Sequence, residues 1–171
     1  VVVCRDFQKT ITSVELLDVY EAKLKKPNAV MIASGEFEED YLRLVRNTYR
    51  MQGSGLVTSP EDVRLSLQRF MNAIQWISDE EELPFLGDQG LSADLPTNCS
   101  LEQLAIFYDD SQKIKVKSSL WKQLDSLNRS ALVYHELFYM YERLHMESTS
   151  ESTRSYVRQI VTKKGYTPVK D

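Results

Sequence analysis

The residues best suited to do chemistry in this chain are His135 and Glu136, which are neighbours inside an apolar run at 131–139. An imidazole can bind a metal ion or take up a proton near neutral pH, and a carboxylate can act as a general base. Tyr139 follows His135 by four residues, so a helix places these two side chains on one face, one turn apart. The pattern fits three kinds of site: a metal or catalytic centre, a ligand pocket without chemistry, or a buried polar network.

The segment 101–145 resembles the active-site unit of zincin-type metallopeptidases, with a hairpin, a short helix and then a buried helix that carries His-Glu. In that family the HExxH signature places two zinc-binding histidines one turn apart, and the glutamate polarises the attacking water. The resemblance implies that His135 binds zinc and that Glu136 is the general base. Tyr139 replaces the second histidine, and a neutral phenol is a far poorer zinc ligand than imidazole. The motif is therefore degenerate, HExxY in place of HExxH.

The overall layout is also similar to uncharacterised exported bacterial proteins. The similarity lies in the opening VVVCRD at 1–6, the LLDVYE segment at 16–21, and a Ser-Thr-Arg sequence at 152–154 after the His-Glu helix. It implies a periplasmic or secreted location, and it implies no activity.

A complete zinc site would need ligands from outside this helix. His145 lies ten residues beyond His135, about 15 Å along a helix axis, so the two cannot share a metal on one helix. Glu142 shares a face with His135 but lies two turns away. We therefore expect no bound cofactor, with zinc as the alternative if the last helix or the loop at 84–98 supplies acids.

A buried polar network is the interpretation that the sequence favours for the His-Glu pair. A carboxylate on so apolar a helix is costly to bury unless its charge is compensated. Arg143 and Arg154 are the natural partners for Glu136 or Glu142, and Arg154 is preferred for Glu136 because the last helix turns back along this one. The network then comprises Glu142, Arg143 and Arg154 with the pair itself.

Aromatic residues surround most of the same helix, which bears on the pocket alternative. They are Tyr134, Phe138, Tyr139 and Tyr141. A helix with apolar residues all round is buried or meets a partner. Core packing is the favoured interpretation, and a pocket or partner surface is the alternative.

Cys4 and Cys99 are the only cysteines, and we expect them to form a disulfide, with two free buried thiols as the alternative. The chain begins without methionine, as a mature exported protein or a trimmed chain does. Closing so long a loop is worth about 4 to 5 kcal/mol in the chain-entropy model.

Length and composition predict one domain. A chain of 171 residues can bury a single sizeable core. Its formal net charge of -4 comes from interspersed acidic and basic residues, which argues against nucleic acid as the main partner. No apolar run is long enough to span a bilayer. A protein or peptide partner stays open, and the oligomeric state is not predicted.

Periodicity and capping residues predict a mainly helical α+β domain with a small antiparallel sheet, zincin-like in arrangement. The first four expected helices are 14–25, where a strand fits nearly as well, 36–51, Pro60 to Ile77, and 119–127. The His-Glu helix follows, with Asn128 as its expected cap. A last helix to Val161 is predicted by the capping box of Ser148 and Glu151. Expected strands are 1–5 and a hairpin of 101–109 with 113–117, whose lysines suggest a sheet edge.

Two functions of different classes remain. The first is an exported envelope protein of binding or structural type that retains the scaffold without the full zinc motif. The second is a divergent metal-dependent hydrolase in which His135 binds metal, Glu136 is the general base, and Tyr139 donates a hydrogen bond to an oxyanion.

Overall fold

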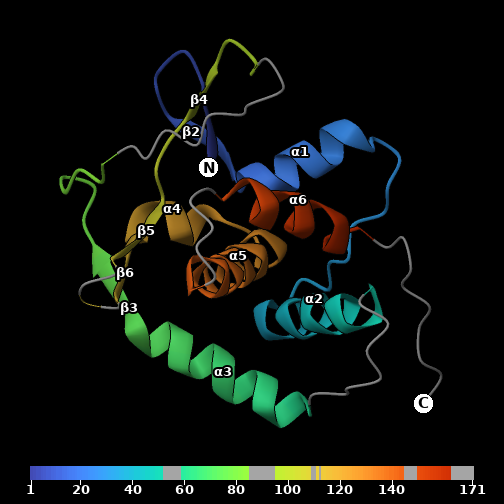
Figure 1. Cartoon of the computed structure of the whole chain (residues 1–171). Coiled ribbons are helices and arrows are strands. Elements are labelled where there is room, and N and C mark those ends of the chain that lie inside the picture. Colours follow the sequence, from blue (N-terminus) through green and yellow to red (C-terminus); the bar gives the residue numbers. More distant parts are fainter. Residues whose placement is uncertain (52–58, 85–94, 109–110, 112, 145–149, 163–171) are drawn as a thin grey trace.

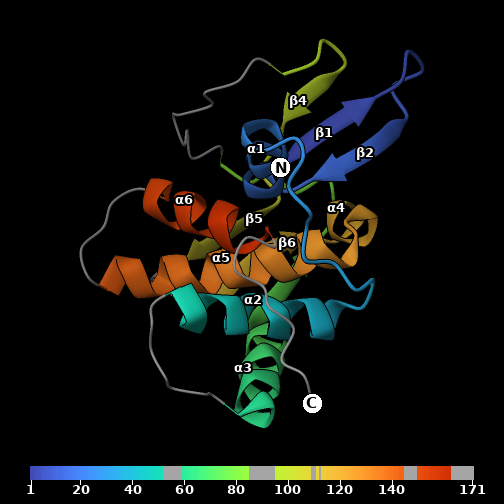
Figure 2. The same cartoon turned by 90° about the vertical axis from the view of Figure 1, so that its right-hand side faces the viewer.

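A computed structural model describes residues 1–51, 59–84, 95–108, 111, 113–144 and 150–162. This part of the chain is an α+β domain with two three-stranded sheets and six helices (Figures 1 and 2). The elements in chain order are β1 Val2–Arg5, β2 Ile11–Glu15, α1 Leu17–Lys25, α2 Phe37–Met51, α3 Pro60–Ala73, β3 Ile74–Ile77, β4 Cys99–Leu101, β5 Ala105–Tyr108, β6 Lys113–Lys117, α4 Ser118–Gln123, α5 Ser126–Leu144 and α6 Glu151–Ile160.

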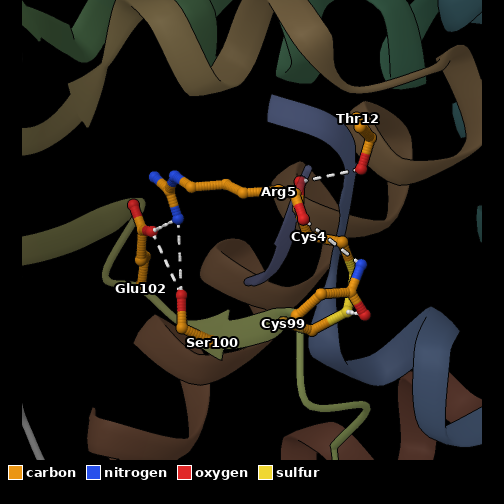
Figure 3. Close-up of a disulfide and its surroundings, with 7 residues drawn as sticks. Cys4, Arg5, Thr12, Cys99, Ser100 and Glu102 are labelled. Carbon is orange, nitrogen blue, oxygen red and sulfur yellow. Dashed lines mark hydrogen bonds and ion pairs between the residues drawn. A yellow bond between two sulfur atoms is a disulfide. The ribbon is translucent and has the colours of Figure 1, made fainter. Parts of the chain in front are cut away.

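The first sheet, with strand order β2-β1-β4, is antiparallel and contains the disulfide. Cys4 and Cys99 are opposite each other in the β1–β4 register, and their sulfurs are bonded. Beside them Arg5 forms an ion pair with Glu102, and this hydrogen bond raises the pKa of the guanidinium (Figure 3). The predicted disulfide is confirmed, and it ties the start of the chain to the segment that leads into β5.

The second sheet has the order β3-β6-β5 and mixes directions: β3 runs parallel to β6, and β5 runs antiparallel to it. The predicted hairpin is confirmed as β5 and β6. Its first strand is shorter than expected, because residues 99–101 pair with β1 in the other sheet. The edge assignment was wrong, since β6 is the central strand, with Ile114 and Val116 buried.

Helix α5 lies at the centre of the helical part, between α6 on one side and α2 on the other in both views (Figures 1 and 2). Helix α3 lies beyond α2 and leads directly into β3. A buried carboxylate fixes the start of α2 against α5. Asp40 accepts hydrogen bonds from the backbone and hydroxyl of Ser34, at 2.5 and 2.7 Å, and from the hydroxyl of Ser126 at 2.6 Å.

Three predicted element boundaries are corrected by the structure. The helix expected over 14–25 begins at Leu17, after β2. The helix expected to reach Ile77 ends at Ala73, because the next four residues pair with β6. Asn128 lies inside α5, whose first turn is capped by the Asp125 carboxylate at 2.8 Å from the Asn128 backbone nitrogen. The last helix is described from Glu151, with Ser150 as its N-cap.

Two other predictions fall on residues that the structure does not describe. Ten residues of the predicted loop, 85–94, lie outside the described residues, as does Ser148. In the described part, no helix is both long and apolar enough to cross a membrane.

Candidate functional site

His135 of α5 contacts α1, an element that the sequence did not connect with it. His135 Nδ1 lies 2.6 Å from Oδ2 of Asp18, which is 1% exposed on α1. With an ionised carboxylate, which can only accept a hydrogen bond, the imidazole would donate from Nδ1. Pairing with a buried carboxylate fixes the tautomer and the orientation of the ring. The arrangement links two helices that are 117 residues apart in sequence.

A second charged contact lies on the same side of α1. Glu21, one turn after Asp18, is 2% exposed and forms an ion pair with Arg158 of α6. The carboxylates of α1 therefore reach both α5 and α6. Asp18 Oδ1 and Glu21 Oε1 are buried without a hydrogen-bond partner among the described residues. Such atoms cost free energy, so the contacts that these carboxylates do make must hold them in place.

The structure describes the side chains of only some of the other residues in the predicted polar network. Glu136 is 8% exposed on α5 and Arg154 is 3% exposed on α6, so both predicted partners are buried. Within the described part of the chain, Arg154 Nε and Nη1 have no hydrogen-bond partner. The ion pair between Glu136 and Arg154 stays a prediction. Glu142 and Arg143 belong to the last turn of α5, where side chains are outside the description.

The residue in the position of the second zincin histidine lies beside His135. The rings of Tyr139 and His135 are 6.3 Å apart between centroids, as expected for side chains one turn apart. Among the described residues, no group of three or more histidine, cysteine, aspartate or glutamate side chains is arranged to hold a metal ion. Asp18 contacts the imidazole as an orienting partner, the role that a carboxylate also plays behind a metal-bound histidine.

A pocket of about 250 Å³ lies between α5, α2 and α3, on a different side of α5 from Glu136. Glu136 is about 200° around α5 from Tyr134, which lines this pocket, since successive residues turn by about 100°. The lining residues are Tyr41, Val45, Thr48 and Tyr49 of α2, Asp62, Val63 and Ser66 of α3, and Tyr134, Leu137 and Phe138 of α5.

Two hydroxyl groups in the lining bond to each other across the interface between α2 and α5. Thr48 and Tyr134 are hydrogen-bonded at 2.7 Å, and Thr48 also donates to the Leu44 carbonyl at 3.0 Å. The Ser66 hydroxyl lies close enough to the Tyr41 phenol to lower its pKa. Both tyrosines are buried, at 4% exposed for Tyr41 and 8% for Tyr134. The hydroxyls of Thr48 and Tyr134 are therefore already hydrogen-bonded within the protein.

Burial shifts the ionisation of these two phenols. It raises the pKa of Tyr41 to about 12, against the opposing effect of the Ser66 hydroxyl, and nearby Tyr49 raises it further. Burial likewise raises the pKa of Tyr134, with the hydrogen bond between Tyr134 and Thr48 opposing and the phenols of Tyr156, Tyr41 and Tyr49 adding to it. Desolvation disfavours the charged phenolate, so both groups stay neutral well above physiological pH.

The sequence indicated the part of the pocket lining that α5 contributes, but not the parts that α2 and α3 contribute. The aromatic residues of α5 were noted as a core or pocket surface, and the structure places Tyr134 and Phe138 in the lining. The α2 and α3 residues gave no signal beyond helical periodicity, because their shared pocket depends on how three helices pack. Phe138 also stacks on Tyr156 of α6, with ring centroids 4.9 Å apart.

Comparisons with protein-family models, curated proteins and solved structures find no match to this chain.

Proposed function

We propose that the protein is an exported binding protein, in which one side of α5 holds the fold together and another side forms a wall of a ligand pocket. The observation that carries this proposal is the pocket of about 250 Å³ between α2, α3 and α5. Ligand sites are concave, mainly apolar and equipped with a few polar groups, and this pocket has that composition. Its size suits a small ligand or a single side chain of a partner.

The contacts of His135 support a structural role for the degenerate motif. Its Nδ1 bonds with Asp18 at 2.6 Å, and the neighbouring carboxylate of Glu21 pairs with Arg158. These interactions join α1 to α5 and α6. A buried polar group that is hydrogen-bonded across helices contributes to a unique packing arrangement. On this account the histidine of the zincin-like helix is retained for the fold.

The Cys4–Cys99 disulfide supports an extracytoplasmic location. Structural disulfides persist in the periplasm and outside the cell, and are rare in reducing cytosol. We accordingly propose that the protein acts in the periplasm or after secretion.

A divergent hydrolase is the second candidate, and the Asp18–His135 contact is the observation that favours it. A carboxylate behind an imidazole orients the ring for proton transfer or metal binding. In that case His135 would act with Glu136 and Tyr139. Metal analysis of protein purified without chelator separates the two candidates: about one zinc per chain, lost in His135→Ala with an unchanged melting temperature, would favour the hydrolase.

The binding proposal is tested by NMR titration with three small probes: phenol, cyclohexanol and choline. The proposal expects at least one probe to shift the resonances of pocket residues in a saturable way. Ser66→Trp, which introduces a large ring from an exposed lining position, should abolish these shifts. Gln68→Trp is the matched control, because Gln68 is exposed on the same helix but does not line the pocket. The proposal fails if no probe binds, or if both variants bind as the wild type does.

A further inference from the structure

We propose that this pocket selects a small organic cation, a quaternary ammonium group carried by a free molecule or by a methylated lysine side chain. This inference rests on the proposed function and adds the chemical class of the ligand. It comes from three properties of the lining: aromatic residues, a carboxylate at the rim, and hydroxyl groups that are already bonded.

Four of the ten described lining residues are aromatic, namely Tyr41, Tyr49, Tyr134 and Phe138. They come from two helices, so they line the pocket from more than one direction. The ionisation of Tyr41 and Tyr134 responds to Tyr49, which shows that these three phenols lie near one another. Aromatic faces attract cations within about 6 Å of the ring centroid, and cages of such rings recognise quaternary ammonium groups.

The charge of the lining also favours a cation. Asp62 is the one charged residue among the ten, and it lies exposed in the first turn of α3. Its Oδ2 accepts a hydrogen bond from Ser59 at 2.6 Å, and its backbone nitrogen donates to the Ser59 hydroxyl at 3.1 Å. These contacts fix the carboxylate at the rim. Among the described lining residues, no lysine or arginine would compensate this negative charge for an anion.

The bonded hydroxyls favour an ammonium with few hydrogen-bonding demands. Thr48 bonds with the Tyr134 hydroxyl and with the Leu44 carbonyl. A ligand that required strong hydrogen bonds from Thr48 or Tyr134 would have to break these contacts and leave buried groups without partners. A quaternary ammonium needs no such bonds, because its methyl groups contact rings and carboxylate directly. A trimethylammonium group is therefore the best-matched form of the ligand.

The deciding experiment compares choline with its neutral isostere, 3,3-dimethyl-1-butanol, by NMR titration of the whole chain. The two molecules have nearly the same shape and differ in charge. We expect choline to bind about tenfold more tightly or better, since each ring adds a cation–π term that the isostere lacks. Equal or tighter binding of the isostere would overturn the cation proposal and leave the binding pocket intact. Failure of both molecules, together with phenol and cyclohexanol, would overturn the binding proposal as well.

Two variants test the separate contributions of the Asp62 carboxylate and the Tyr49 ring to choline binding. Asp62→Asn should weaken choline about two- to fivefold while leaving the isostere unchanged, as expected for a partly exposed charge pair. Glu61→Gln is the matched control, because Glu61 lies in the same helical turn and does not line the pocket. Tyr49→Leu should weaken choline more than the isostere. Unchanged choline affinity in folded Asp62→Asn and Tyr49→Leu would contradict the proposed cage.

A second arm of the experiment identifies the source of the ammonium group. The arm adds a short neutral peptide with one trimethyllysine, and the same peptide with unmodified lysine. Tighter binding of the trimethyllysine peptide than of choline would indicate a protein partner, whereas tighter binding of choline would indicate a free solute. If neither peptide binds and choline does not exceed its isostere, the assignment of an ammonium ligand is wrong.

Discussion

His135 and Asp18 form a partly buried contact of 2.6 Å that joins α5 to α1. Each residue gives the other a hydrogen-bonding partner that water cannot readily replace. His135→Ala should therefore lower the free energy of unfolding by about 1 to 3 kcal/mol, measured by urea denaturation near pH 7. The double variant Asp18→Ala with His135→Ala should cost less than the sum of the single changes, because the interaction is lost only once. Strictly additive effects would show that the contact contributes nothing to stability.

Two arginines on α6 should differ in their contributions to stability. Arg158→Met removes the partner of Glu21, which is 2% exposed, and should cost about 3 to 5 kcal/mol because an uncompensated buried charge remains. Arg154→Met should cost less, since Nε and Nη1 of that guanidinium have no hydrogen-bond partner within the described part of the chain. Both losses are measured by chemical denaturation. A larger loss for Arg154→Met would favour the predicted pairing of Arg154 with Glu136.

Removal of the disulfide should destabilise the protein strongly. The bond links cysteines with a sequence separation of 95, and its loss releases a long loop in the unfolded chain. The chain-entropy model gives about 4 to 5 kcal/mol for a loop of this size. The double variant Cys4→Ser with Cys99→Ser should show this loss in a thermal melt, and wild-type protein alkylated without reductant should show no free thiol. A melt that is the same with and without reductant would contradict the structural role.

Alkaline pH should destabilise the fold through the buried tyrosines. Burial raises the pKa of Tyr41 to about 12 in the folded state, whereas an unfolded tyrosine titrates near 10. The unfolded chain therefore releases its proton first, so this contribution to stability is complete below about pH 10 and is lost as pH rises toward 12. Tyr41→Phe should show a shallower decline of unfolding free energy between these values. An identical decline in the variant would show that Tyr41 does not carry the effect.

Local patterns in the sequence were sufficient to predict the helices with a clear apolar face. The spacing in 36–51 predicted α2 to within one residue, and Ser59 with Pro60 located the start of α3. The residues 74–77 were wrongly assigned to a helix because Ile74 and Ile77 fit helical spacing, and only pairing with β6 makes this segment a strand. Such pairing depends on residues about forty positions later, which periodicity does not detect.

The candidate site shows the same limit. His135 and Glu136 stood out by residue type, but the Asp18 partner is 117 positions away and carries no local signal. Asn128 was expected as a helix cap, and instead its Oδ1 accepts a hydrogen bond from the Leu16 backbone nitrogen at 2.7 Å, at the start of α1. Polar residues whose partners come from distant elements could be identified as candidates, and their roles required the fold.

The central claim is that His135 stabilises the fold by joining α5 to α1, while the side of α5 that lines the pocket binds a ligand. It is tested most directly by measuring one affinity in two variants, using whichever of phenol, cyclohexanol and choline binds the wild type most tightly. The account predicts that Ser66→Trp weakens this ligand by about tenfold or more, while folded His135→Ala binds it within about twofold of the wild type. Loss of binding in His135→Ala with full retention in Ser66→Trp would contradict the account and place the functional site at the histidine.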